Sequence, residues 1–367
     1  MTTTTNLTAA AVNKIDRADM LGRVMRMPQH FREAAERVKS VPVKLQVERI
    51  RNIVIVGMGG SAIGGELVKS LTYNQLPVPL TVCRSYALPQ FADPHTLVIA
   101  SSYSGNTEET LSTFQQALQR GAQIVCVTSG GQIGALAEKN GLTKFSLPAG
   151  FPPRSALVHL LVPILKTLHA CGFIADPMPD INEAIAVLEK LEQRYHPTHP
   201  APENLAKSLA LALAERLPLI YAAEIYETVA WRWKEQFCEN AEILSWHNVF
   251  PELNHNELVG WGLRRALDQK FQVIYLNDAQ ATTAEIHPRV RARMNLTQGL
   301  IEQSSAPVIN VAAVGNSLLA RFFSLIFLGD LASVYLAVLG GVDPTPVAKI
   351  DYLKNAMAKV SAPLAPA

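Results

Sequence analysis

Two segments with the same layout constrain the fold more than any other feature of this chain. In each, a short run of mostly β-branched residues leads into a loop of small residues and then into a helical pattern. The first loop is Gly57–Gly65 (GMGGSAIGG), after Ile53–Val56, and the second is Ser101–Thr110 (SSYSGNTEET), after Leu97–Ala100. Short apolar strands that run directly into helices are typical of parallel α/β sheets. The chain is therefore expected to contain a parallel sheet flanked by helices.

The two loops predict an anion site at the carboxyl edge of that sheet. Parallel α/β sheets bind ligands there, where helix N-termini present unpaired backbone N–H groups. Glycines let these N–H groups close around an anion, and short hydroxyl side chains add donors without adding charge. Neither loop contains Lys or Arg. We therefore expect a cradle for a phosphate monoester, with the reacting cations contributed from elsewhere in the chain.

The same alternation continues along the 367 residues and predicts two α/β units. In the first unit, further strands are expected at Leu80–Cys83, Leu97–Ser101, Ile124–Thr128 and Phe145–Leu147, with helices at Ala62–Leu71, Thr107–Gln119 and Gly131–Lys139. In the second unit, strands are expected at Leu219–Ala222, Ile243–Trp246, Phe271–Leu276 and Val308–Val314. Helical spacing over Asp16–Val47 precedes both units, and the Pro-rich segment Tyr195–Glu203 is expected to link them. The predicted organisation is an N-terminal extension and helix (1–47), a first, phosphate-binding domain (48–195) and a second domain (203–367).

Composition excludes some classes of function. A net charge of +2 without a basic cluster argues against nucleic-acid binding. Ser317–Leu339 is apolar enough to raise the question of a membrane span, but Arg321 and Asp330 interrupt it. A deeply buried helix is expected instead, in the core or against a second subunit. The four cysteines are scattered without ligand spacing, which favours a reducing, cytoplasmic setting.

Three residues are candidates for chemistry beside a bound phosphate. Arg154 follows two prolines in a loop before a helix, which would fix the direction of its guanidinium group. Glu239 lies between aromatic residues and a predicted strand, where a carboxylate can act as a general base. His255, flanked by asparagines, can exchange protons near neutral pH, and His247 is a similar candidate with weaker surroundings. Each has a plain structural alternative: a surface arginine, a helix-end carboxylate and a packed histidine.

A dinucleotide site is the competing interpretation of the first loop. Gly57, Gly59 and Gly64 after a strand resemble a dinucleotide-binding fingerprint. The next strand, however, ends at Arg84 and Ser85 instead of the acidic residue that binds a ribose, although an arginine could accept the 2′-phosphate of NADP. This interpretation also leaves the second loop without a role.

Taken together, the motifs resemble those of the bifunctional phosphoglucose/phosphomannose isomerases, a branch of the sugar isomerase (SIS) superfamily. Besides the two glycine- and serine-rich loops, the similar segments are PPRSAL, KEQFCENAE, PELNHNELVGW and the terminal block GDLASVYLAVLGGVDPTPVAKIDYLK. They occur in order from Val54 to Lys354. Cys238 and Glu242 depart from the usual residues of the family, and Glu242 adds negative charge beside Glu239.

The resemblance implies two SIS domains, each a doubly wound, flavodoxin-like three-layer sandwich, in a homodimer. It implies that the phosphate is held by Gly60, Ser61, Ser102, Ser104 and Thr107. Arg154 would lie beside the C1 and C2 atoms, Glu239 would be the base, and His255 and Lys354 would open the sugar ring, with His255 contributed by the other subunit. No metal or nucleotide cofactor is implied.

The activity implied is the interconversion of glucose 6-phosphate and mannose 6-phosphate with fructose 6-phosphate through a cis-enediol. Two alternatives remain open at this point. One is a sugar-phosphate-binding regulator without catalysis, and the other is an isomerase of a different phosphosugar, because the loops recognise the phosphate and not the sugar.

Overall fold

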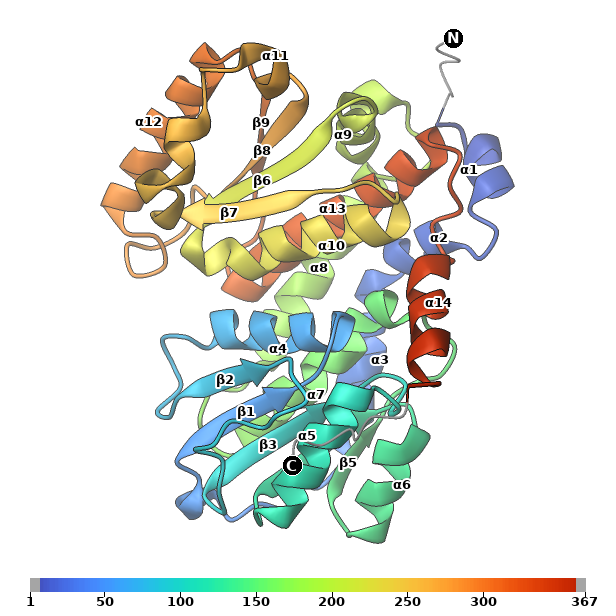
Figure 1. Cartoon of the computed structure of the whole chain (residues 1–367), viewed down its shortest axis with the longest axis vertical. Coiled ribbons are helices and arrows are strands. Elements are labelled where there is room, and N and C mark those ends of the chain that lie inside the picture. The colour runs from blue at the N-terminus through green and yellow to red at the C-terminus, as the bar shows by residue number, and fades with distance from the viewer. Residues whose placement is uncertain (1–6, 361–367) are drawn as a thin grey trace. The chain divides into compact units, whose positions relative to one another are not determined.

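The computed structural model describes residues 7–360 and divides into two compact units, each described here by itself (Figure 1). Unit 1 comprises residues 7–28 and 180–347, and unit 2 comprises residues 29–179 and 348–360. Residues 1–6 of the predicted N-terminal extension lie outside the described residues. The domain limits expected from the sequence stay a prediction.

Unit 2 contains a five-stranded parallel sheet in the order β2-β1-β3-β4-β5. The strands are β1 (Asn52–Val56), β2 (Leu80–Cys83), β3 (Thr96–Ser101), β4 (Gln123–Thr128) and β5 (Thr143–Ser146). Helices α4 (Gly60–Leu71) and α7 (Leu157–Ala170) pack on one face, and α5 (Glu108–Gln119) and α6 (Gly131–Lys139) on the other. The prediction of a flavodoxin-like parallel sheet flanked by helices is confirmed.

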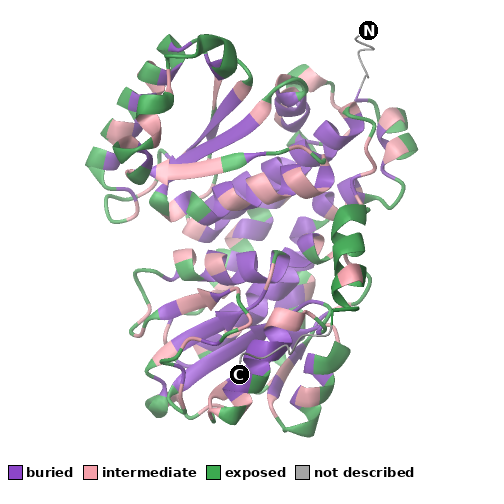
Figure 2. Cartoon of the chain, viewed as in Figure 1, coloured by how far each residue is buried: buried purple, intermediate pink, exposed green. Residues whose placement is uncertain are grey.

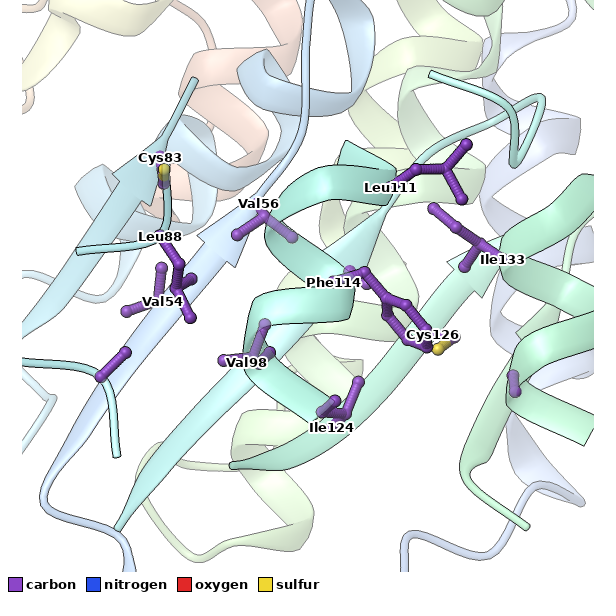
Figure 3. Packing of buried hydrophobic residues seen from close by; sticks show 14 residues of the cluster. Val54, Val56, Cys83, Leu88, Val98, Leu111, Phe114, Ile124, Cys126 and Ile133 are labelled. Atoms are coloured by element: carbon purple, nitrogen blue, oxygen red, sulfur yellow. The ribbon is translucent and has the colours of Figure 1, made fainter. Parts of the chain in front are cut away.

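Alternation along β1 divides its side chains between the two faces of the sheet. Val54 and Val56 pack toward α5, where Phe114 is the largest member of the buried cluster (Figure 3). Ile55 points to the opposite face, where a methyl group built on Gly65 of α4 would lie 2.9 Å from its Cγ2 atom. Burial of each such side chain stabilises the fold by roughly 1.5–3 kcal/mol, so both faces anchor the strand.

Unit 1 contains a four-stranded parallel sheet in the order β7-β6-β8-β9. The strands are β6 (Leu217–Ala223), β7 (Trp246–Phe250), β8 (Phe271–Asn277) and β9 (Val308–Ala312). Helix α10 (Glu227–Asn240) packs on β6 and β7 and also on α13 (Leu318–Leu339), which contacts α9 (Leu205–Leu213) as well. The remaining helices of the unit are α1 (Ala9–Ile15), α2 (Met20–Met25), α8 (Met178–Arg194), α11 (Arg265–Asp268) and α12 (Pro288–Gln303).

Helix α13 is the core helix of unit 1 (Figure 2). Within residues 7–360 it is the one helix long and apolar enough to cross a membrane, yet 94% of its most apolar stretch is buried inside the protein. Its two charges are both paired: Arg321 with Asp278 at 2.9 Å, and Asp330 with Arg232 at 2.6 Å. Helices of the same chain cover α13, so its apolar composition no longer requires a second subunit.

Two segments differ from the sequence-based expectation. The strand predicted at Ile243–Trp246 is wrong, because Glu242 adopts a left-handed conformation and Ile243 donates its N–H back to the Phe237 carbonyl at 3.3 Å. Ile243 therefore closes the end of α10, and β7 begins only at Trp246.

The helix predicted to run to Val47 ends earlier. Helix α3 (Met27–Lys39) stops before Pro42, because a proline disfavours helical geometry in the residue preceding it. The extended chain that follows is held by Lys44, whose backbone N–H donates to Thr143 of β5 at 3.1 Å.

The Pro-rich segment Tyr195–Glu203 lies within unit 1. Buried Asn204 donates to the Tyr195 carbonyl at 2.9 Å, and the Lys207 ammonium group donates to the carbonyls of Pro197 and His199. These bonds satisfy backbone acceptors that a proline-rich loop cannot pair with itself.

Candidate active site

The strand order of unit 2 places the two predicted phosphate loops side by side. Chain connections leave β1 and β3 in opposite directions at this point, and such a switch point is where doubly wound sheets bind ligands. A methyl group on Gly57 would lie 2.8 Å from the Ser101 carbonyl oxygen. The Tyr103 N–H donates to the Ser61 hydroxyl oxygen at 3.2 Å. The structure thus brings the first loop against the second.

The helices that follow these loops begin without side-chain caps. Gly59, before α4, has no side chain with which to cap the helix. The side chain of Thr107, before α5, accepts no capping hydrogen bond from that helix. In α4 the backbone itself closes part of the helix start, because the Ser61 and Ala62 N–H groups donate to the Met58 carbonyl at 3.1 and 3.4 Å. At both helix starts the helix dipole favours negative charge.

Hydroxyl side chains of the second loop are held in position by the loop itself. The hydroxyl oxygens of Ser102 and Thr107 are 3.0 Å apart, and Ser102 also accepts the Gly105 N–H at 3.2 Å. Ser104 accepts the Asn106 N–H at 3.2 Å. A hydroxyl oxygen that accepts one bond can still donate its own proton, so the cradle offers neutral donors suited to a phosphate.

A third loop, Thr128–Gly131 after β4, also belongs to this site, although the sequence analysis did not assign it a role. Ser129 donates its hydroxyl to the Tyr103 carbonyl at 2.6 Å, and the Gln132 N–H donates to the Asn106 side chain at 3.0 Å. Gly105, at φ 69°, lies so close that a methyl group there would be 1.9 Å from the Gly130 oxygen. The third loop has the same strand–loop–helix layout as the first two, and this layout in the sequence could have identified it as part of the site.

Arg154 lies against the first loop. It is buried in the short 3-10 helix Pro153–Ala156, and a methyl group on Gly60 would meet the Pro153 carbonyl oxygen at 2.9 Å. Gly60 therefore permits the close approach of the segment that carries the guanidinium group. Tyr103 supports the same segment, because its hydroxyl donates to the Pro148 carbonyl at 2.8 Å and accepts the Phe151 N–H at 2.9 Å. Sequence reasoning missed this role of Tyr103.

Glu239 lies on the last turn of α10 in unit 1 and is half-buried. The helix around it is firmly anchored on α13: Trp233 donates to the Leu325 carbonyl at 2.9 Å, and Asn240 donates to Ser333 at 2.8 Å. A carboxylate on such a helix end has a well-defined position, as a general base requires.

His255 is exposed at the end of the 3-10 helix Glu252–His255, which follows β7. Nearby Glu257 fixes the loop through hydrogen bonds from the Tyr221 hydroxyl and, at 2.6 Å, from the Asn248 amide. His247, the weaker candidate, stacks on the Trp231 ring at 5.8 Å. Burial, together with the charge of Lys234, lowers the pKa of His247 to about 4. His247 is therefore a neutral packed side chain at pH 7.

Lys354 lies on α14 (Ala348–Met357), a helix whose side chains are mostly exposed (Figure 2). The residues predicted for phosphate binding, together with Arg154, meet at one edge of unit 2, whereas Glu239 and His255 belong to unit 1. The catalytic and binding roles of these residues stay predictions.

The N-terminus of α13 in unit 1, in contrast, is occupied by side chains of the protein itself. The carboxylate of Glu183 accepts the N–H groups of Asn316 and Ser317 at 2.6 and 2.8 Å, and the Ser317 side chain caps α13. An internal anion already occupies this end of α13. The helix starts at the switch point of unit 2 carry no side-chain cap and are therefore the better place for a phosphate.

Comparison with known proteins agrees with this arrangement. Residues 202–357 match the family described as the bacterial phospho-glucose isomerase C-terminal SIS domain. A bifunctional phosphoglucose/phosphomannose isomerase of Caldicellulosiruptor bescii is 43% identical over 93% of this chain and 99% of its own length. A bifunctional phosphoglucose/phosphomannose isomerase of Thermoplasma acidophilum is 37% identical over 89% of this chain and 98% of its own length.

A solved structure shows the same fold at low sequence identity. A hypothetical protein of Thermus thermophilus superposes with a TM-score of 0.75 at 17% identity, over 95% of this chain and 93% of the other. The two isomerases from C. bescii and T. acidophilum match 93% and 89% of this chain at 43% and 37% identity, well above the 17% of the solved structure. The chain therefore belongs to the family of bifunctional phosphoglucose/phosphomannose isomerases.

Proposed function

We propose that this protein is an aldose–ketose isomerase that interconverts glucose 6-phosphate and mannose 6-phosphate with fructose 6-phosphate. The observation that carries the proposal is the cradle at the switch point of unit 2, with two helix N-termini that lack side-chain caps, oriented hydroxyls and Arg154 held against it. Family membership supports the same substrate class, a sugar phosphate. The free thiols of the four cysteines support a cytoplasmic location.

The proposed reaction moves one proton between C1 and C2 through a cis-enediolate. His255 and Lys354 open the sugar ring by moving protons at the ring oxygen and the anomeric hydroxyl. Glu239 then takes the C2 proton and returns it at C1, while Arg154 stabilises the negative charge on the enediolate oxygens. Glucose and mannose 6-phosphates differ only at C2 and share this intermediate, so one site serves both.

The test is an assay of fructose 6-phosphate conversion in the presence of a chelator, with separate detection of the two aldose products. Formation of both aldose phosphates is the expected result. A single product would restrict the substrate range. Binding of fructose 6-phosphate without any product would favour a regulator over an enzyme.

We propose in addition that the active protein is a homodimer in which His255 completes the site of the other subunit. Large apolar side chains are exposed close to this histidine: Val259 is 89% and Leu263 88% exposed. Exposed apolar residues grouped in this way are typical of protein interfaces.

Mixing two inactive variants tests this arrangement. An equal mixture of Glu239→Gln and His255→Ala, unfolded and refolded together, should recover about a quarter of the wild-type activity, because half of the random dimers contain one intact site of two. A mixture that stays inactive although it contains mixed dimers would place both residues in one subunit.

Removing two hydroxyls of the cradle should mainly weaken substrate binding. Ser104→Ala combined with Thr107→Ala is expected to weaken the affinity for 6-phosphogluconate at least about 100-fold, because hydrogen bonds to charged groups contribute about 1.5–3 kcal/mol each. Calorimetric titration measures this affinity. Thr113→Ala is the matched control, since its hydroxyl bonds to carbonyls inside α5. Unchanged affinity in the double variant would locate the phosphate elsewhere.

Gly60→Ala should impair turnover without unfolding the protein. The new methyl group would lie 2.9 Å from the Pro153 carbonyl oxygen and displace the segment that carries Arg154. Small displacements of a catalytic group can lower the rate about 100-fold, so kcat is expected to fall by about that factor. Gly64→Ala on the same helix is the control, because its methyl group would find Leu160 at an ordinary 3.6 Å. Equal kcat values for the two variants would contradict this role of Gly60.

A further inference from the structure

A cavity lies in unit 2, apart from the predicted phosphate cradle. Its volume is about 310 Å³, and it is lined by residues of α3, β5 and α7 and of the chain that follows α3 and β5. None of its lining residues belongs to the three glycine- and serine-rich loops or to the segment Pro153–Ala156. The volume lies at the lower end of the range for small-molecule pockets, about 300–1,000 Å³.

One wall of this cavity contains a buried histidine without a hydrogen-bond partner. The His159 side chain is 0% exposed, and neither ring nitrogen has a partner among residues 7–360. A carboxylate oxygen of Glu33 lies 4.0 Å from its Nε2 atom, which is too long for a hydrogen bond. Leaving a buried polar group unpaired costs about 1–3 kcal/mol, so such groups usually bind water or a ligand.

His159 is neutral at physiological pH. Burial lowers its pKa to about 4, and the positive charges of His30 and Arg37 act in the same direction. A neutral imidazole ring presents one N–H donor and one acceptor nitrogen. It therefore matches a hydroxyl group, which can accept from one partner and donate to another, better than a bare anionic oxygen.

The other walls add cations and apolar surface. Arg37 of α3 and Lys144 of β5 both line the cavity, and Lys144 also pairs with Glu138. Val38, Phe145 and Pro163 supply apolar contacts. A guanidinium and an ammonium group on two separate elements can bind a carboxylate or phosphate between them.

From this combination we infer that the cavity of α3, β5 and α7 binds a small hydroxylated organic anion. Its carboxylate or phosphate group contacts Arg37 and Lys144, its hydroxyl group contacts His159, and its short carbon chain lies against Val38 and Phe145. The Phe151 ring packs on His159 at 5.2 Å between ring centroids, and the Phe151 N–H donates to Tyr103. The bound anion would therefore lie close to the loop that leads to Arg154.

Calorimetric titration of the full-length protein tests this inference, with glycerate and citrate as the probes, because neither carries a phosphate group for the cradle. At least one probe is expected to bind with a dissociation constant below about 1 mM. Arg37→Gln should weaken this binding at least tenfold, since a charge-assisted hydrogen bond is lost. Lys39→Gln, which removes a charge from the same helix outside the cavity, should leave the affinity unchanged.

Three further variants make the result specific to this cavity. Ala34→Leu should abolish binding by filling the space from α3, and His159→Phe should weaken it by removing the polar contacts. Thermal melting of each variant confirms that it is folded. The double variant Ser104→Ala/Thr107→Ala should bind the probes as the wild type does, because its cradle is elsewhere.

Two results would overturn the inference. Absence of binding for both probes would mean that the cavity holds only water. Binding that persists in Arg37→Gln and Ala34→Leu but disappears in the cradle variant would mean that the probes occupy the phosphate cradle instead. Neither result depends on whether the protein is an isomerase.

Discussion

Glu239→Gln is expected to lose isomerisation while it keeps its affinity for 6-phosphogluconate. The amide has nearly the same shape as the carboxylate but cannot take a proton from C2, and general base catalysis contributes about 10²–10⁴-fold to a rate. We therefore expect kcat to fall by about that factor. Because Trp233 and Asn240 anchor α10 on α13, the substitution should leave the helix in place.

Two measurements separate chemistry from binding in this variant. Solvent deuterium should enter the fructose 6-phosphate pool in the wild type but not in Glu239→Gln, since the exchange requires the same base. Glu227→Gln, which removes an exposed carboxylate from the first turn of the same helix, should retain activity. Turnover near the wild-type rate in Glu239→Gln would remove Glu239 from the base role.

Asp330→Ala is expected to cause the largest loss of stability. Asp330 accepts two hydrogen bonds from Arg232, at 2.6 and 3.1 Å, and both side chains are only 2% exposed. The alanine would leave a buried guanidinium group without its carboxylate, which typically lowers the free energy of unfolding by about 3–5 kcal/mol.

Tryptophan fluorescence during urea unfolding reports this effect for unit 1 by itself. All four tryptophans, Trp231, Trp233, Trp246 and Trp261, belong to that unit. The double variant Arg232→Met/Asp330→Leu should recover most of the loss, because paired apolar residues can replace a buried ion pair. In the same unit, Arg26→Ala removes the exposed partner of Asp19 and should change stability by less than about 1 kcal/mol. If Asp330→Ala also lowered the free energy of unfolding by less than about 1 kcal/mol, the Arg232–Asp330 ion pair would not be needed for the stability of unit 1.

Most of the secondary structure could be predicted from the sequence. The β-branched runs and helical spacing act over a few residues, so they indicated the strands before the two loops correctly. The loops themselves are shorter than predicted, because α4 begins at Gly60 and α5 at Glu108. The helix at Gly131–Lys139 is confirmed at both ends. The predicted boundaries of strands and helices were wrong where the chain turns. Ile243, for example, has the β-branched character of a strand residue but closes the end of a helix.

Side-chain roles that depend on packing were harder to predict. The apolar segment Ser317–Leu339 was compatible with an interface, and only the surrounding helices show that unit 1 buries it within the chain. His159 stands in LVHLLVPIL, which reads as an ordinary core helix. Its lack of a partner arises because α3 and β5, distant in sequence, leave a space beside it.

The sequence by itself determined that this protein has parallel α/β units, and it predicted a phosphate cradle between strand ends and helix starts, because strand, loop and helix signals are local. It also carried the motifs of the isomerase family. Only the tertiary structure decided that Gly60 and Tyr103 hold the Arg154 segment against the cradle, that Glu183 closes the start of α13, and that a cavity forms around His159. These features need residues far apart in the chain to meet, and no short segment specifies such contacts.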